Sequence, residues 1–442
     1  MKNCTRRIQK HDFLTRQLHF PAMTLAIVNV GQLVTLSGPA RPRVGSELRE
    51  LGVIENAAMI TENGRISAAG PYADLRARVA DAGSVIDAEG RCVTPGFVDA
   101  HTHLVFAGNR AAEFEQRIGG ATYQQIAAAG GGILRTVALT RAASEDELLA
   151  AARRHCDWMM RSGTTTVEAK SGYGLDRETE LKMLRVLARL DAEGPPRGAC
   201  GPRIVPTLLA AHTIPPEFAG RRDAYVRFVA DELIPEVAVA KLAKYCDAFC
   251  DDHAFTVDEC RTVLASARGN GLGLRIHAEQ FRPGTGAALA AELGAATADH
   301  LETVDDATLG ELKRAGVQPV LLPGSVFCLR RTEYPPARAM IDAGLAIVLA
   351  TDFNPGSSPV VSMPFVMSLG CLQMGLTPAE ALTAATFNAA CSLGLGGQIG
   401  SIEAGKQGDF LIHEVSDYRE LAYFVAAPLR PRVFVGGTEV TV

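Results

Sequence analysis

The sequence predicts an α/β fold, a (β/α)8 barrel accompanied by a small β-sandwich domain built from both ends of the chain. Short apolar segments alternate with long helical patterns through the middle of the chain, as in a parallel sheet with crossover helices. Alternating strand patterns precede this region and return after it. A chain of 442 residues is also long enough for a large core and a second unit.

The terminal strand patterns define the predicted small domain. Residues 23–36 and 57–70 alternate as strands do, and the second pattern turns at Asn63 and Gly64, the dipeptide favoured in two-residue hairpins. Similar patterns recur near the other end of the chain, at 400–415 and 431–442. We therefore expect a disordered tail at 1–22, a small β domain from 23–94 and 402–442, and a barrel at 95–401.

The predicted barrel strands number eight, as a closed barrel requires. Helix starts between them carry capping boxes, in which Ser144 is followed by Glu147 and Thr377 by Glu380. Each start opens a single long helical pattern. The candidate strands are 96–103, 164–174, 203–212, 246–255, 273–281, 296–302, 318–325 and 346–356.

Composition excludes several classes of protein. The chain is 47% hydrophobic and 21% charged with a formal net charge of −5, and it has no basic run that would follow a nucleic-acid backbone. No stretch approaches the ~18 apolar residues of a membrane helix. The first 22 residues lack the apolar segment of a secretory signal, although a mitochondrial-type targeting peptide is an alternative. The ten cysteines form no Cys-x-x-Cys pair, which indicates reduced thiols in the cytoplasm.

Polar residues recur where the predicted strands end. Side chains at the carboxyl ends of barrel strands share one open mouth. Residues two apart on a strand face the same side, so His101 and His103 present two imidazoles to one point. The residues at or just after strand ends are His101, His103, Tyr173, His212, His277, His300 and Asp352.

Four of these residues suit a metal ion. An isolated His-x-His pair is more often an ordinary polar strand end. The recurrence of His277 and Asp352 at equivalent strand ends makes coincidence the poorer explanation for His101 and His103. Three imidazoles and one carboxylate suit Zn²⁺ or Fe²⁺, and a bound metal lowers the pKa of water to roughly 7.

The motifs PGFVDAHTH and ATDFNPG resemble the amidohydrolase superfamily, metal-dependent hydrolases on this barrel with a two-ended β domain. The segments HTHLVFAGNRAAEF, AGGGI, SGTTTVEAKSGYGL, LLAAHTIPPE, IHAEQF, ADHLE and ATDFNPGSSP resemble its imidazolonepropionase family, from about Met23 to the C-terminus. Those enzymes open 4-imidazolone-5-propanoate to N-formimidoyl-L-glutamate in histidine degradation, and relatives are commonly homodimers.

The resemblance implies one zinc or iron ion, with His101, His103, His277 and Asp352 as its ligands. It also implies a small-molecule substrate. The charge and the absence of a long apolar run predict no nucleic-acid or membrane partner. The implied substrate contacts are Arg110, Tyr173, His212, Gln280, Asn354, Gly356 and Ser357. Arg110 and Tyr173 are suited to the substrate carboxylate.

Two positions depart from the family pattern. Gln280 stands where some members carry a glutamate, and Ser357 stands where a threonine is common. A glutamine cannot accept a proton as a base does, so we assign proton handling to Asp352 and His300. Either His300 or His212 is expected to stabilise the oxyanion.

Other polar residues are assigned lesser roles. Lys170 is expected to have a structural or ion-pair role, and His155 to pack within a helix. Asp251, Asp252 and His253, at the end of the fourth predicted strand, are weaker candidates for the mouth, and His11, His19 and His413 fall outside the barrel.

Two further functions stay open. One is another cyclic-amide hydrolase or an aminohydrolase, such as a hydantoinase, dihydroorotase or guanine deaminase. The other is a non-catalytic scaffold, which the presence of all four ligands disfavours.

Overall fold

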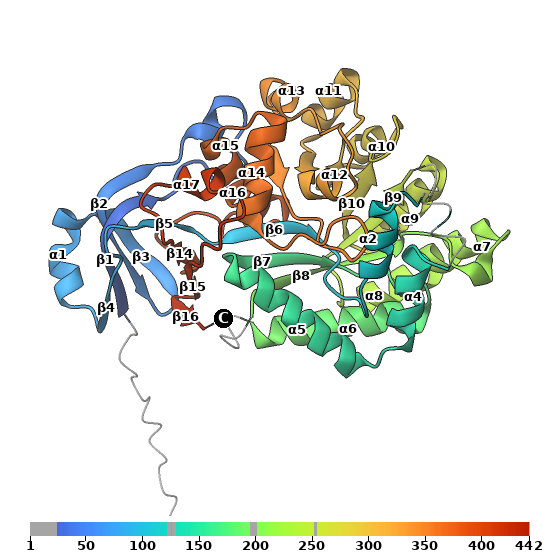
Figure 1. Cartoon of the computed structure of the whole chain (residues 1–442), viewed down its shortest axis with the longest axis horizontal. Coiled ribbons are helices and arrows are strands. Elements are labelled where there is room, and N and C mark those ends of the chain that lie inside the picture. The colour runs from blue at the N-terminus through green and yellow to red at the C-terminus, as the bar shows by residue number, and fades with distance from the viewer. Residues whose placement is uncertain (1–23, 122–124, 126–129, 195–200, 252–253, 442) are drawn as a thin grey trace, which may run out of the picture.

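The structure is a computed structural model that describes residues 24–121, 125, 130–194, 201–251 and 254–441. One of its two eight-stranded sheets has the order β13-β12-β11-β10-β9-β8-β7-β6, so each strand lies beside its neighbour in the sequence. All these pairs are parallel, which confirms the predicted (β/α)8 barrel (Figure 1). The strands are β6 (Phe97–Thr102), β7 (Thr164–Lys170), β8 (Arg203–Ala211), β9 (Tyr245–Cys250), β10 (Gly273–Ala278), β11 (Thr297–His300), β12 (Gln318–Leu321) and β13 (Val348–Leu349).

The last barrel strand is shorter than the sequence predicts. β13 spans two residues, whereas the apolar pattern extends over 346–356. The chain leaves the strand before Asp352, whose φ of 53° is incompatible with extended backbone. This departure turns the Asp352 segment toward the first strand.

Contacts between the ends of the first and last strands close the barrel. The backbone N–H of Asp352 donates to the carbonyl of His101 at 3.0 Å. Asp99 accepts from the backbone N–H of Thr351 at 3.0 Å and from its hydroxyl at 2.6 Å, across 252 residues of sequence. We call this join the seam; it lies beside two of the predicted metal ligands.

Helices cover the outside of the barrel (Figure 1). The capping boxes at Ser144 and Thr377 are both present. The single helix expected after Thr377 is instead two, because Thr386 departs from helical backbone with φ −131° and ψ −87°. The helices of this part are α2 (Ala111–Ile118), α4 (Ile133–Ala142), α5 (Glu145–Arg161), α6 (Arg177–Glu193), α7 (Arg222–Arg227), α8 (Ile234–Val239), α9 (Val257–Gly269), α10 (Gly286–Leu293), α11 (Asp306–Ala315), α12 (Pro323–Cys328), α13 (Ala337–Asp342), α14 (Met363–Met374), α15 (Pro378–Ala384) and α16 (Phe387–Ser392), with a π-helical turn at Phe228–Leu233 and short 3-10 turns at Gly45–Arg49 and Pro216–Phe218.

Strands from both ends of the chain form a second, mixed sheet. Its order is β16-β15-β14-β5-β1-β2-β3, and β4 also pairs with β1. Figure 1 shows these early and late strands together at one end of the molecule. The elements are β1 (Thr24–Val34), β2 (Val53–Glu62), β3 (Arg65–Pro71), α1 (Tyr72–Ala80), β4 (Ser84–Asp87), β5 (Cys92–Pro95), β14 (Phe410–Ile412), α17 (Glu420–Tyr423), β15 (Arg432–Val435) and β16 (Thr438–Val440).

The terminal sheet has its own turn chemistry and core. Asn63 and Gly64 both have positive φ, 51° and 79°, as a type I′ hairpin requires. Phe410 stacks on Phe434 with ring centroids 4.4 Å apart. The extra β unit from both termini is thereby confirmed, whereas its boundaries at 94 and 402 stay predictions.

Two other expectations concern the whole chain. The eight cysteines in the described ranges are free and mostly buried. Within those ranges, the structure contains no helix with the length and apolarity needed to cross a membrane. The predicted tail at 1–22 lies outside the described residues.

Candidate metal centre at the barrel mouth

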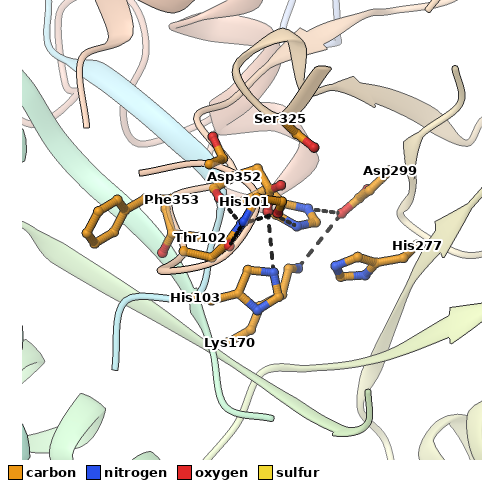
Figure 2. Close-up of polar contacts among 12 residues, drawn as sticks. His101, Thr102, His103, Lys170, His277, Asp299, Ser325, Asp352 and Phe353 are labelled. Carbon is orange, nitrogen blue, oxygen red and sulfur yellow. Dashed lines mark hydrogen bonds and ion pairs between the residues drawn. The ribbon is translucent and has the colours of Figure 1, made fainter. Parts of the chain in front are cut away.

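Three imidazoles converge inside the mouth of the barrel. β6 ends near His101 and His103, and β10 carries His277. One ring nitrogen from each of the three lies within 4.8 Å of the others, and Figure 2 shows the three rings directed toward one region. Nε2 of His101 and Nε2 of His277 are buried without a hydrogen-bond partner in the described residues, and His103 directs its Nε2 at Asp352 Oδ1, 3.4 Å away. Unpaired buried nitrogens are costly, so this set suits a bound cation.

Asp352 lies at the edge of the same cluster. Its Oδ1 is 3.5 Å from His101 Nε2 and 3.4 Å from His103 Nε2. Burial alone would raise the pKa of Asp352, but the neighbouring His103 and His300 hold that pKa below its ordinary value. The carboxylate is therefore ionised at neutral pH and able to ligate a metal or accept a proton.

Two buried aspartates form hydrogen bonds with the Nδ1 atoms of His101 and His277. Asp299 Oδ2 is 2.6 Å from His101 Nδ1, and Asp247 Oδ1 is 3.1 Å from His277 Nδ1. A carboxylate that accepts a hydrogen bond from Nδ1–H leaves the Nε2 lone pair free for a metal. Burial lowers the pKa of His101 well below its ordinary value, and the nearby Lys170 charge lowers it further. His101 is thus kept in the neutral form that binds metals.

His300 faces the cluster from the end of β11. One of its nitrogens lies within 4.8 Å of a ligand atom of His101 and of Asp352. Burial opposes protonation of His300, yet Glu302, whose Oε1 is 3.3 Å from Nδ1, leaves the pKa raised overall. His300 and Leu301 have positive φ, 80° and 65°, an uncommon backbone that is often found at functional sites.

His212 and Tyr173 form one wall of the mouth. His212 stacks on His103 with centroids 5.1 Å apart, and its Nδ1 lies 3.0 Å from the carbonyl of Gly172. Tyr173 packs against both rings, with centroid distances of 5.9 Å to His103 and 5.4 Å to His212. Burial raises the pKa of Tyr173 well above its ordinary range, so the phenol stays a donor.

Arg110 already has a protein partner. Its Nε is 2.7 Å from Glu113 Oε2, which also accepts from the backbone of Gly132 at 3.1 Å. The remaining side of the guanidinium packs on Gly356, where a Cβ on any larger residue would lie 2.2 Å from Nη1. A larger residue at 356 would therefore displace the Arg110 guanidinium from its present position against this loop.

The loop after the last strand is organised by Asn354. Its amide donates to the Asp352 carbonyl at 2.7 Å and to Ser357 Oγ at 2.8 Å. Its side-chain oxygen accepts from the backbone of Gly356 and Ser357 at 2.8 and 2.7 Å. Gln280 lies elsewhere on the rim and donates to Ser325 at 3.4 Å. Asn354 therefore shapes the loop through its own side chain.

The residues given lesser roles lie mostly away from the cluster. Lys170 is buried in ion pairs, as expected. His155 packs on Phe106 with centroids 4.6 Å apart. His413 lies in the terminal sheet beside Thr94 at 2.8 Å. Asp252, His253, His11 and His19 lie outside the described residues.

Sequence reasoning missed the buried charges beneath the imidazoles. They are Glu168, Asp247, Arg275, Asp299 and Glu302. A signal was present, since charged residues inside otherwise apolar strands are rarely buried without a partner. Glu168 and Lys170 are two apart on β7, as are Arg275 and His277 on β10, so each pair faces one side.

Comparison with known proteins places this geometry in a family. The family model described as "Amidohydrolase family" matches residues 92–440. An imidazolonepropionase of Solibacter usitatus (strain Ellin6076) is 55% identical over 412 residues, covering 93% of this chain and 97% of that protein. An imidazolonepropionase of Geobacillus kaustophilus (strain HTA426) is 47% identical over 410 residues, covering 92% and 95%.

Solved structures share the fold at low identity. A 5-methylcytosine deaminase from Klebsiella pneumoniae aligns with a TM-score of 0.70 at 16% identity, covering 94% of this chain and 97% of that one. An adenosine deaminase from Xanthomonas campestris, described with bound zinc, aligns with a TM-score of 0.65 at 19% identity, covering 94% and 92%. From its match to the family model over residues 92–440, and from its 55% and 47% identity with the two imidazolonepropionases, the chain belongs to the amidohydrolase family.

Proposed function

We propose that this protein is an imidazolonepropionase, which hydrolyses the ring of 4-imidazolone-5-propanoate to give N-formimidoyl-L-glutamate. The observation that carries the proposal is identity of 55% and 47%, over more than nine tenths of the chain, with proteins of that name. The clustered imidazoles and Asp352 at the mouth support a metal-dependent hydrolase of cyclic amides.

We propose that His101, His103, His277 and Asp352 hold one zinc or iron ion. The support is that one ring nitrogen from each of the three histidines lies within 4.8 Å of the others, that Nε2 of His101 and of His277 has no hydrogen-bond partner in the described residues, and that carboxylates hold these two rings from behind. A bound ion of this kind lowers the pKa of water from 15.7 to roughly 7, which supplies a nucleophile at neutral pH.

Asp352 and His300 are the residues proposed to move protons. Asp352 is ionised and buried at the cluster, so it can accept the proton of the attacking water. The proton then has to reach the ring nitrogen that leaves. Because Gln280 has no basic group, it is given a role in substrate contact only.

His300 or His212 is proposed to donate to the oxygen on which negative charge develops. His300 is buried and His212 is partly buried at the mouth. A raised pKa favours His300 as the donor, since Glu302 stabilises its protonated form. His212 has its Nδ1 at the Gly172 carbonyl, which leaves Nε2 for a ligand.

Arg110 and Tyr173 are proposed to bind the propanoate group. A guanidinium offers a planar set of donors that matches a carboxylate. Glu113 holds Arg110 through Nε and Nη2, and so fixes the direction of the guanidinium. Asn354, Gly356 and Ser357 would contact the substrate from the adjoining loop.

We further propose that the protein works in the cytoplasm as a homodimer on this small molecule. The free and mostly buried cysteines of the described ranges support a reducing compartment. The boundaries 23–94, 95–401 and 402–442 are proposed as those of the two structural units.

Purified protein tests the proposal directly. Metal analysis should give one zinc or iron ion per chain. Freshly generated 4-imidazolone-5-propanoate should be consumed, while hydantoin, dihydroorotate and guanine should not. Turnover of one of those three with the imidazolone ignored would assign a different amidohydrolase activity. A chain with neither metal nor turnover would be a non-catalytic scaffold.

A further inference from the structure

A network of buried charges lies beneath the imidazole cluster. Lys170, from the end of β7, places its Nζ 2.9 Å from Glu168 Oε1 and 2.8 Å from Asp247 Oδ2. The same Nζ lies 3.8 Å from Asp299 Oδ2. Arg275 lies 3.9 Å from Glu168 and 3.8 Å from Asp299. All five side chains have zero solvent exposure.

Lys170 is the point at which two separate arms of this network meet. One arm runs from Lys170 to Asp247 and on to His277 Nδ1. The other runs from Lys170 to Asp299 and on to His101 Nδ1. Figure 2 shows Lys170 and His101 both directed at Asp299. No other lysine or arginine in the described ranges forms ion pairs with both of these aspartates.

We propose that Lys170 is a positioning residue for the metal centre, one ammonium group that orients both His101 and His277 through Asp299 and Asp247. The inference rests on the proposed metal-dependent function. It adds a residue that would contact neither the metal nor the substrate.

The cost of burying a lysine supports a specific role. A buried ammonium group is strongly disfavoured unless carboxylates compensate it. Here those carboxylates are the same groups that accept hydrogen bonds from the two imidazoles. One cation that faces both carboxylates helps to keep the two Nε2 lone pairs on a common centre. Without Lys170, Asp299 would keep Arg275 at 3.8 Å, whereas Asp247 would have no lysine or arginine partner in the described ranges. Carboxylates that hydrogen-bond a metal-ligating histidine, as Asp299 and Asp247 would here, typically change metal affinity by about 10–100-fold, and Lys170 would act through these two carboxylates.

Glu168 provides a matched control within the same network. It is equally buried and pairs with Lys170, and its Oε2 accepts from the backbone N–H of Thr102 at 3.4 Å, but in the described residues its side chain contacts no imidazole of the cluster. If Lys170 only balanced charge for folding, removal of Glu168 should disturb the centre as much as removal of Lys170. If Lys170 acts through the two aspartates, removal of Lys170 should weaken metal binding more than removal of Glu168 does.

The experiment compares Lys170→Met and Glu168→Gln with the parent protein as full-length, purified chains. Zinc affinity is measured by competition with a chromophoric chelator, and folding of the metal-free proteins is followed by circular dichroism. We expect Lys170→Met to weaken zinc binding by about 10–100-fold and Glu168→Gln to change it by less than about threefold. Lys170→Arg, which retains the charge, should fall between Lys170→Met and the parent.

The outcomes separate this inference from the proposed function. Equal zinc affinity in Lys170→Met and the parent, or an equal loss in Glu168→Gln, would overturn the positioning role and leave the activity untouched. A parent protein that binds zinc without hydrolysing the imidazolone would overturn the function, while the affinity comparison would still stand. If no variant at position 170 folds, Lys170 serves folding and the inference is wrong.

Discussion

His101 and Asp299 form a hydrogen bond of 2.6 Å in the closed interior of the barrel, where both side chains have zero solvent exposure. The bond joins the first barrel strand to the sixth. It determines which nitrogen of His101 carries the proton, and therefore which nitrogen faces the cluster.

Asp299→Asn should weaken the metal centre and leave the fold intact. The amide is similar in size, but its neutral oxygen is a weaker acceptor for Nδ1–H, so His101 is held less firmly. We expect zinc affinity to fall by about 10–100-fold. Asp409→Asn, a change at a buried aspartate beside Arg203, is the control and should leave zinc affinity unchanged. Equal affinity in Asp299→Asn and the parent would show that His101 is oriented by other contacts.

Asp352→Asn should remove most turnover. The proposed base is lost together with a ligand, and general base catalysis alone contributes about 10²–10⁴-fold. Steady-state rates on 4-imidazolone-5-propanoate measure the effect, with circular dichroism as the test of folding. Asp306→Asn, on the exposed start of α11, should retain full activity. Turnover close to that of the parent would exclude Asp352 as the base.

Arg110→Met should chiefly raise KM. A hydrogen bond to a charged group contributes about 1.5–3 kcal/mol, which corresponds to an increase of roughly 10–150-fold. If the contact is equally strong in the ground and transition states, kcat should change little. Arg177→Met removes an exposed arginine paired with Glu236 and serves as the control. An unchanged KM would mean that Arg110 serves only its pair with Glu113.

His413 should make stability depend on pH. Burial lowers its pKa from 6.5 to about 3 in the folded protein. Between these values the unfolded chain binds a proton that the folded protein does not, so the free energy of unfolding decreases as pH falls from 6.5 toward 3. His413→Gln should flatten this decline, by about 1–2 kcal/mol between pH 7 and pH 5.

Denaturant titrations at several pH values measure the His413 effect. Thr94→Val removes the hydrogen bond at 2.8 Å but keeps the imidazole. This control should lower stability at every pH without flattening the decline. Parallel pH curves for His413→Gln and the parent would assign the acid sensitivity to other groups.

The fold was predictable because its patterns are local and repeated. The apolar period of the strands, the capping boxes at Ser144 and Thr377, and the hairpin at Asn63 and Gly64 all match the structure. The short β13 was not predictable, because the residues after it favour a strand by composition. There the contacts of Asp352 and Thr351 with the first strand outweigh local preference.

The site was predictable where strand position alone fixes it. His101, His103 and His277 lie at or next to strand ends of one barrel and Asp352 follows its last strand, so their meeting follows from topology. Which carboxylate holds which imidazole depends on the rotation of each strand about its axis and on barrel stagger, which the sequence does not specify. The pairing of Arg110 with Glu113 was missed for a simpler reason. An arginine at the start of a helix can point into solvent or pair with any of several nearby groups, and the sequence does not say which.

The seam has a consequence for how the enzyme comes into being. Thr351 and Asp352 are made long after Asp99 and His101 during synthesis on the ribosome, and 252 residues separate Asp99 from Thr351. A nascent or truncated polypeptide that ends before Thr351 contains three of the four proposed ligands. It lacks the segment after the eighth strand that closes the barrel against the first strand. We therefore expect hydrolytic activity to appear only after the last barrel strand and Asp352 have been synthesised. Fragments that end before Thr351 should have no partial activity.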